Sequence, residues 1–207
     1  DFMKNFINVG GTEEEQVEQI SKWLKSNGLQ IVAGIVIGLS AIWGWGQYGD
    51  YQDREAENAR TLYLNYATDT SNTGAYDQLL SDYGSSSYAD QATLVMAKQL
   101  FDAGSYNGAL SLIEPLISSD DIAINSTAAL RAASVYLQLG QHDSALSTLD
   151  SLSDTSFSGL VNNMKGDIYV DLGNTADAQT HYTLALNSVT ANSTLSQLIQ
   201  IKLDDLN

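Results

Sequence analysis

Two histidines and two pairs of adjacent aspartates are the residues of this 207-residue chain whose types suit acid–base or metal chemistry. His142 and His181 lie 39 residues apart and match no spacing of metal ligands. The pairs Asp120-Asp121 and Asp204-Asp205 stand near expected helix ends, where carboxylates serve as solvated caps. The sequence has neither a phosphate-binding glycine loop nor a nucleophile elbow. We therefore expect both histidines on the surface, no catalytic residue, no cofactor and no metal, and hence a protein that is not an enzyme.

The charge of the chain is strongly acidic. It carries 25 Asp and Glu against nine Lys and Arg, and twenty of those acids but only six of the bases lie in positions 50–207. Such a surface repels nucleic acid, so no nucleic-acid partner is expected. Either it is a solvated surface suited to a salty habitat or it includes an acidic docking face. The absence of cysteine excludes disulfide and thiolate chemistry.

An uncharged run from Ser26 to Gly49 contains the apolar stretch Leu29–Tyr48. As a helix its 24 residues reach about 36 Å, against about 30 Å of bilayer hydrocarbon. A buried core helix would be shorter and would carry polar positions on one side. A signal peptide would need a basic segment upstream, and the upstream segment here is acidic. The stretch therefore predicts a retained single transmembrane helix at positions 28–49.

Small residues and tryptophans inside and beside this span suggest how it sits in the bilayer. A GxxxG pattern with one further small residue allows close packing against another membrane helix. Tryptophans prefer the membrane–water interface and would set the depth of the span. The expected packing residues are Gly34, Gly38 and Ala41, and the expected interface anchors are Trp23, Trp43 and Trp45.

The orientation of the span depends on the flanking Lys and Arg residues, because the more basic flank stays in the cytoplasm. Lys22 and Lys25 precede the span, and Arg54 and Arg60 follow it at a greater distance. The acidic part after the span is long enough to be translocated whatever its charge. We expect the N-terminus in the cytoplasm and the C-terminal domain outside.

The residues before the span are predicted to form an amphipathic helix. Thr12 and Glu15 have the spacing of a capping box, so the helix should begin there. Val17, Ile20 and Leu24 then recur on one face, with Glu18 and Lys22 one turn apart on the polar side. This helix either lies at the membrane interface or docks a partner.

The residues after the span are expected to form a helix ending near Thr70, followed by a turn. Residues 69–74 imitate the first half of a calcium-binding EF-hand loop. Ser71 and Thr73 replace the usual ligands, and Leu80 stands where a bidentate glutamate is required, so the segment is interpreted as a turn. A degenerate leading repeat is expected between Tyr63 and Tyr83.

From Tyr88 the chain repeats itself. Gly104, Gly140 and Gly173 are separated by 36 and 33 residues, and each follows one apolar helical pattern and precedes another. Small residues seven positions before and five positions after each glycine would let the two helices of a unit approach closely; they are Ala97 and Ala109, Ala133 and Ala145, and Gly166 and Ala178. The pattern resembles the tetratricopeptide repeat, although the signature tryptophan is absent. It predicts an all-α helical-repeat solenoid.

In that geometry the first helix of each unit lines a groove. The expected partner-binding residues are Leu94, Lys98, Phe101, Leu130, Ser134, Leu137, Asn163, Asp167 and Val170. The face is unusually apolar, so either it receives a polypeptide or the protein's own elements fill it. A last helix with Thr194 as its N-cap and an apolar stripe through Leu195, Ile199 and Leu206 is expected to cover the end of the solenoid.

The whole arrangement resembles the bacterial YfgM family. The resemblance rests on the acidic helix with Gln16-Val17-Glu18, the segment 23–28 (WLKSNG), the glycine-rich span, the degenerate repeats and the C-terminal segment 195–203 (LSQLIQIKL). It covers nearly the whole chain from Glu14. It implies four parts: a short cytoplasmic segment at 1–27, a transmembrane helix at 28–49, juxtamembrane helices and a leading repeat at 50–87, and repeats with a capping helix at 88–207.

The resemblance also implies a function, which is that of an ancillary subunit of the SecYEG translocon in the bacterial inner membrane, with its repeats in the periplasm. The implied partners are the translocon, a membrane-anchored prolyl-isomerase-like periplasmic chaperone and exported polypeptides, together with an envelope-stress response regulator reached through the N-terminal segment. The residues by themselves also allow a repeat scaffold for another envelope assembly, such as outer-membrane or cell-wall machinery.

Overall fold

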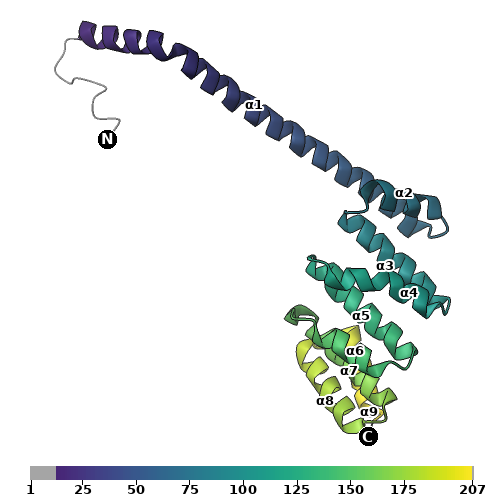
Figure 1. The fold of residues 1–207 in the computed structure, drawn as a ribbon. Helices are drawn as coiled ribbons and strands as arrows, with labels where there is room; N and C mark the ends of the chain where they lie inside the picture. Colours follow the sequence, from purple (N-terminus) through teal and green to yellow (C-terminus); the bar gives the residue numbers. More distant parts are fainter. Residues whose placement is uncertain (1–12, 207) are drawn as a thin grey trace. The chain divides into compact units, whose positions relative to one another are not determined.

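The computed structural model describes the backbone of residues 13–206 and the side chains of residues 17, 18 and 20–206. Within this part of the chain the regular secondary structure is entirely helical (Figure 1). Two compact units divide the chain, residues 1–55 and residues 56–207, and they are described in turn. The predicted all-α class is confirmed.

The first unit contains most of helix α1, which runs from Glu13 to Thr68. The structure joins the expected amphipathic helix, span and following helix into one continuous element. Its start agrees with the predicted one, and its end lies two residues before the expected Thr70. The expected capping box lies outside the described side chains. Glu18 and Lys22 form the expected pair, with 2.8 Å between Oε1 and Nζ.

The apolar part of α1 is long and hydrophobic enough to cross a membrane, and none of its apolar window is buried in the protein. Its large side chains are exposed, including Leu29, Val32, Ile35, Val36, Ile37, Leu39 and Ile42. A soluble protein buries such a row, because about 25 cal/mol is gained per Å² of apolar surface removed from water. A helix also pairs its backbone groups within itself, as hydrocarbon requires. The structure therefore agrees with a single membrane span.

The second unit is a stack of antiparallel helix pairs (Figure 1). Tyr66 near the end of α1 packs in one cluster with Tyr76 and Leu79 of α2 (Thr73–Tyr83). The first repeat unit is α3 (Ser87–Asp102) with α4 (Tyr106–Ile113), and the second is α5 (Ile122–Gln138) with α6 (His142–Asp150). The third is α7 (Ser158–Asp171) with α8 (Thr175–Ser188). Short 3₁₀ segments, η1 (Glu114–Ser118) and η2 (Thr155–Phe157), follow α4 and α6.

The three periodic glycines end the first helices of the units. Gly104, Gly140 and Gly173 have φ angles of 75°, 68° and 71°, a left-handed conformation that costs other residues about 1–2 kcal/mol. In each unit the residue after the glycine donates its amide to a carbonyl five residues earlier, as in Gln141 to Tyr136 at 2.8 Å. The chain therefore reverses after each glycine, as the spacing predicts.

Close packing within each unit depends on the expected small residues. The five expected alanines are fully buried, and Gly166 is buried against the ring of Tyr182. A Cβ atom built on Gly166 would lie 2.3 Å from Cε1 of Tyr182, so only glycine allows α7 and α8 to approach this closely. The ring of Tyr182 on α8 fits against α7 because Gly166 has no side chain.

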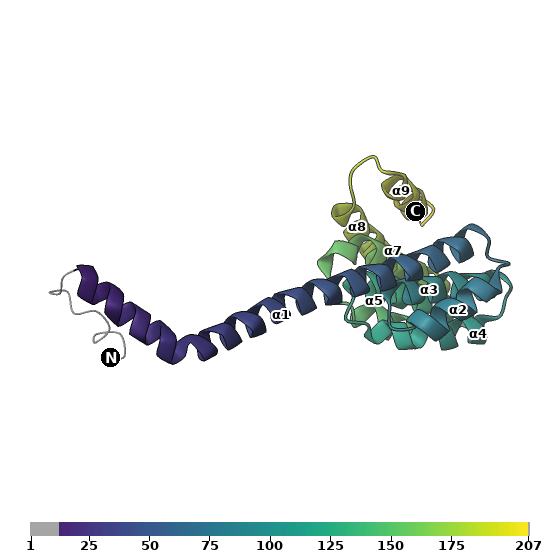
Figure 2. The same cartoon turned by 90° about the horizontal axis from the view of Figure 1, so that it is seen from above.

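Helix α9 (Thr194–Asp204) packs on α8 at the end of the stack (Figure 2). Its fully buried Ile199 lies in a cluster with Ala178, Tyr182 and Ala185, and Leu195 and Leu206 pack around it. The capping helix is confirmed. The prediction of its N-cap is wrong by one residue, because Ser193 has the extended backbone that a cap needs and its Oγ accepts the amide of Ser196, while Thr194 is already helical.

Residues 69–72 form the expected turn, which ends two residues earlier than predicted because Thr73 and Gly74 already belong to α2. Oδ1 of Asp69 accepts hydrogen bonds from the amide and the hydroxyl of Ser71, at 3.1 and 2.6 Å. These bonds hold the pKa of Asp69 below its ordinary value. The side chain of Asn72 then caps α2 by accepting from the amide of Ala75. The polar side chains of this segment therefore serve the backbone of the turn.

Candidate partner-binding surface

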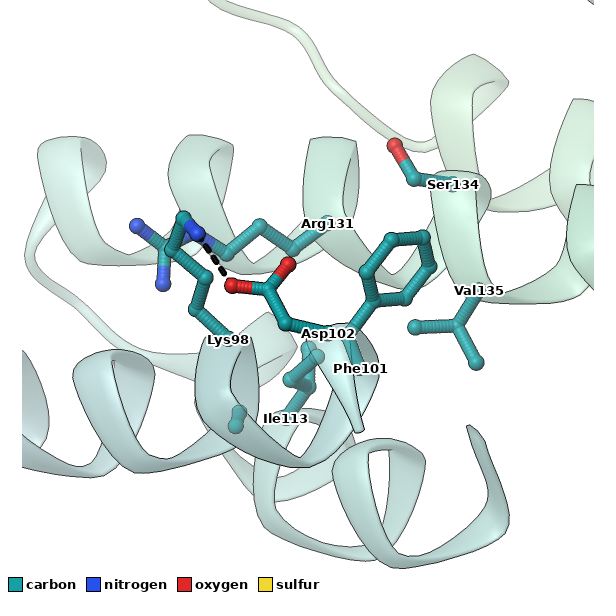
Figure 3. A pocket seen from close by; sticks show the side chains of 8 residues that line it. Lys98, Phe101, Asp102, Ile113, Arg131, Ser134 and Val135 are labelled. Atoms are coloured by element: carbon teal, nitrogen blue, oxygen red, sulfur yellow. Dashed lines mark hydrogen bonds and ion pairs between the residues drawn. The ribbon is translucent and has the colours of Figure 1, made fainter. Parts of the chain in front are cut away.

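A small pocket lies between the first helices of the first and second units, α3 and α5 (Figure 3). Its volume is about 240 Å³, and it is lined by Ala97, Lys98, Phe101, Asp102, Ile113, Arg131, Ser134 and Val135. Four of these residues are apolar, and the charged ones stand along one edge. The pocket therefore combines an apolar interior with a polar rim.

Three of the predicted groove residues, Lys98, Phe101 and Ser134, line this pocket. Phe101 is half-buried and makes an edge-to-face contact with Tyr106, with 5.3 Å between ring centroids. Lys98 pairs with Asp102 one turn later on the exposed side of α3. The structure thus brings together side chains from two repeat units.

Leu94 is a correction to the predicted groove. Its side chain is only 5% exposed and packs in the core with Ala97, Ala128 and Ala132. The prediction placed Leu94 on the same outward face of α3 as Lys98 and Phe101, because the first helix of each repeat unit lines the groove. α3 also packs against α5, so this face turns inward at Leu94.

Arg131 is a pocket residue that the repeat pattern missed. Its Nη1 donates a hydrogen bond to the carbonyl oxygen of Leu94, across from α5 to α3. Burial lowers the pKa of its guanidinium, which nevertheless stays charged at neutral pH. The sequence held one clue, since Arg131 is one of only six basic residues in positions 50–207.

The groove residues of the second unit lie against the third unit. Leu130 and Leu137 are half-buried beside the cluster of Ala133, Leu149 and Ile168. Ser134 donates to the carbonyl of Leu130 at 3.0 Å and lies 3.9 Å from the sulfur of Met164. These side chains are partly used to hold the repeats together.

In the third unit the protein's own α9 occupies the predicted face. Nζ of Lys202 lies 2.7 and 2.8 Å from the two carboxylate oxygens of Asp167 and 3.0 Å from Oδ1 of Asn163. Val170, one turn further along α7, is exposed. The protein's own α9 therefore fills the third-unit part of the predicted groove. The pocket between α3 and α5 is open.

The hydroxyl of Tyr182 also donates to Asp167, at 2.7 Å. Burial and this carboxylate raise the pKa of Tyr182 well above its ordinary value. Asp167 thus accepts from one residue on α8 and one on α9. Asp167, which the sequence analysis assigned to partner binding, therefore holds α7, α8 and α9 together.

The two histidines lie at contacts between helices. Nε2 of His142 is 2.6 Å from Oδ2 of Asp171. Both histidines are partly exposed. The ring of His181 stacks on Tyr169 with 5.2 Å between centroids and lies 2.9 Å from Oδ1 of Asn162. In the described part of the chain no three metal-ligating side chains gather around one point.

The predicted packing residues and anchors of the span lie on the exposed surface of α1. Cβ atoms built on Gly34 and Gly38 would meet nothing within 4 Å, and Ala41 is exposed. Trp43 and Trp45 are 71% and 82% exposed, and Trp23 is 39% exposed. The positions of Gly34, Gly38, Ala41, Trp43 and Trp45 are therefore open to lipid or to another helix.

Comparison with known proteins identifies the relatives of this chain. The family described as tetratricopeptide repeat-like domain matches residues 21–207. A protein of Aggregatibacter actinomycetemcomitans named ancillary SecYEG translocon subunit is 30% identical over 94% of this chain and 97% of its own length. Proteins of the same name from Haemophilus influenzae and Escherichia coli K12 are 28% and 26% identical, over 94% of this chain and 97% and 96% of their lengths. The chain therefore belongs to the tetratricopeptide repeat-like family of ancillary SecYEG translocon subunits, the YfgM family.

Proposed function

We propose that this protein is a non-enzymatic scaffold, held in the bacterial inner membrane beside the SecYEG translocon by the apolar part of α1. Support comes from the names of its relatives and from the unburied apolar helix on the same chain as a helical-repeat unit. Such repeats bind other proteins in many families. The single observation that carries the proposal is this pairing of an unburied membrane-length helix with an open pocket between repeats.

In this proposal the N-terminus is cytoplasmic and the repeat unit is periplasmic. Lys22 and Lys25, immediately before the span, favour that orientation. The repeat unit then links emerging chains to a membrane-anchored prolyl-isomerase-like chaperone. The segment before the span contacts an envelope-stress response regulator in the cytoplasm.

Photo-crosslinking in native membranes tests the proposal. A crosslinking residue is placed at Lys98 or Phe101 in the pocket, and at Ser147 or Leu184 on second helices as matched controls. The pocket positions are expected to capture periplasmic proteins more strongly than the controls. Stronger capture at the controls would contradict a pocket-based scaffold.

Affinity purification from gently solubilised membranes tests the location. Recovery of translocon subunits with the tagged full chain is the expected result. Recovery of cell-wall or outer-membrane assembly proteins without translocon subunits would contradict the proposal and favour a scaffold for another envelope assembly.

A further inference from the structure

We propose that the pocket between α3 and α5 takes one bulky apolar side chain of a partner polypeptide, and that Arg131 at its edge binds an Asp or Glu side chain next to that residue in the partner. This inference rests on the proposed function, because it names what the repeat unit recognises. The evidence is the size of the pocket, the free donors of Arg131 and the charge around them.

The size of the pocket suits one side chain. Its volume of about 240 Å³ lies below the range of about 300–1,000 Å³ that is usual for small-molecule sites. A cavity of about 150 Å³ already holds a benzene ring. Phe101, Ile113 and Val135 supply apolar walls, so a phenylalanine or leucine of a bound segment would exchange water for carbon contacts.

Arg131 supplies donors at the rim. A guanidinium has five N–H groups in a planar fork, and the bond to the carbonyl of Leu94 uses one nitrogen. Figure 3 shows the side chain extending along the pocket toward Lys98. Lys98 is already paired with Asp102. In the part of the chain that the structure describes, no carboxylate lies within ion-pair distance of Arg131.

The charge balance favours a single carboxylate as the partner of Arg131. Lys98 and Asp102 cancel each other, which leaves Arg131 as a net positive charge beside the apolar pocket. A carboxylate matches the guanidinium fork in two parallel hydrogen bonds. Positions 50–207 as a whole carry fourteen more acids than bases, so a run of acidic residues would be repelled at long range. One acidic residue beside one apolar residue therefore fits best.

The acid is assigned to a side chain rather than to a C-terminus. Beyond the pocket, the half-buried side chains of Leu130 and Leu137 continue the apolar face past Ser134, so a bound chain has surface to follow beyond its anchor residue. A chain that ends at Arg131 would leave this surface uncovered. Peptides with blocked and free C-termini distinguish the two sources of a carboxylate.

The test measures binding of fluorescent peptides to the full chain in detergent micelles. The peptides are blocked at both ends and carry a central Phe-Asp, Phe-Asn or Ala-Asp pair. We expect the Phe-Asp peptide to bind about tenfold more tightly than either of the others, since an ionised hydrogen bond and a buried ring are each worth about that factor. A Phe-Asn peptide with a free C-terminus should bind as weakly as its blocked form.

Matched variants assign the effect to Arg131. In Arg131→Gln the preference for Phe-Asp over Phe-Asn should fall to less than about twofold, because the guanidinium that reads the carboxylate is gone. Arg60→Gln, which removes the same charge from an exposed site on α1, should keep the full preference. Thermal unfolding of both variants shows that each is folded.

Three results would overturn the inference. The Phe-Asn peptide binds as tightly as the Phe-Asp peptide, or the Ala-Asp peptide binds as tightly as the Phe-Asp peptide. In the third, Arg131→Gln and Arg60→Gln lose the preference for Phe-Asp over Phe-Asn to the same extent. Tight binding of the Phe-Asn peptide with a free C-terminus would show that Arg131 binds the terminal carboxylate of a chain, and it would contradict the assignment to a side chain. Failure of translocon subunits to copurify is a separate measurement. It would contradict the proposed function while leaving peptide recognition by Arg131 intact.

Discussion

Lys202 and Asp167 form an ion pair between the last helix and the first helix of the third unit, with Nζ 2.7 and 2.8 Å from the two carboxylate oxygens. Their side chains are only 27% and 26% exposed. The ammonium also lies 5.8 Å from the ring centroid of Tyr182. The capping helix is therefore held by a half-buried polar contact as well as by Ile199, and the same contact closes the third-unit part of the groove.

Replacing Asp167 by Asn is expected to lower the free energy of unfolding by about 1.5–3 kcal/mol, because the ammonium of Lys202 stays half-buried without its carboxylate. Asp102→Asn is a matched control that also removes one negative charge. Asp102 pairs with Lys98, and both side chains are exposed, at 55% and 62%, so its loss should cost less than about 1 kcal/mol. Urea unfolding measures both. Equal losses would show that Asp167 contributes no more than a surface carboxylate.

Gly166→Ala is expected to destabilise the third unit by about 1–3 kcal/mol, since the added methyl group would overlap the ring of Tyr182. The second change Tyr182→Leu should make the Gly166→Ala substitution cost less, although it removes the hydroxyl that donates to Asp167. A double-mutant cycle in urea isolates the coupling between the two positions. Additive effects would contradict the overlap.

The pH dependence of stability should include a contribution from His181. Burial, together with the charge of Lys165, lowers the pKa of His181 below its ordinary value. The unfolded chain then binds a proton more readily than the folded chain, so the free energy of unfolding falls as the pH drops below about 6.5. Thermal unfolding between about pH 7.5 and pH 5.5 should show a flatter profile for His181→Gln than for the native chain. Parallel profiles would exclude this contribution.

Replacing Gly34 and Gly38 by Leu is expected to leave membrane insertion intact, because leucine favours it. It should lower copurification of other membrane subunits several-fold, since small residues allow close approach of helix backbones. Val32→Leu and Val36→Leu together serve as the control for added bulk elsewhere on α1. Unchanged copurification in the glycine variant would make this segment a simple anchor.

The sequence alone determined the fold class, the repeat spacing and the existence of the span. Local physics decides these features. A left-handed turn after a helix favours glycine, so the positions of Gly104, Gly140 and Gly173 in the sequence predict where the first helix of each repeat ends. A charge-free run of membrane length is visible whatever surrounds it. Close packing of two helices needs small residues at the crossing, and these recur at fixed distances from the glycines.

Only the tertiary structure decided which side chains of the groove are open. Leu94 is apolar and correctly spaced for the groove, yet contact between α3 and α5 buries it. Asp167 and Lys202 are 35 residues apart, and nothing in either local pattern indicates that they pair. Arg131 lies outside the repeat pattern and reaches the pocket edge only because α5 packs beside α3. Burial and pairing depend on neighbours distant in sequence, whereas helix, turn and span depend on residues within a few turns of one another.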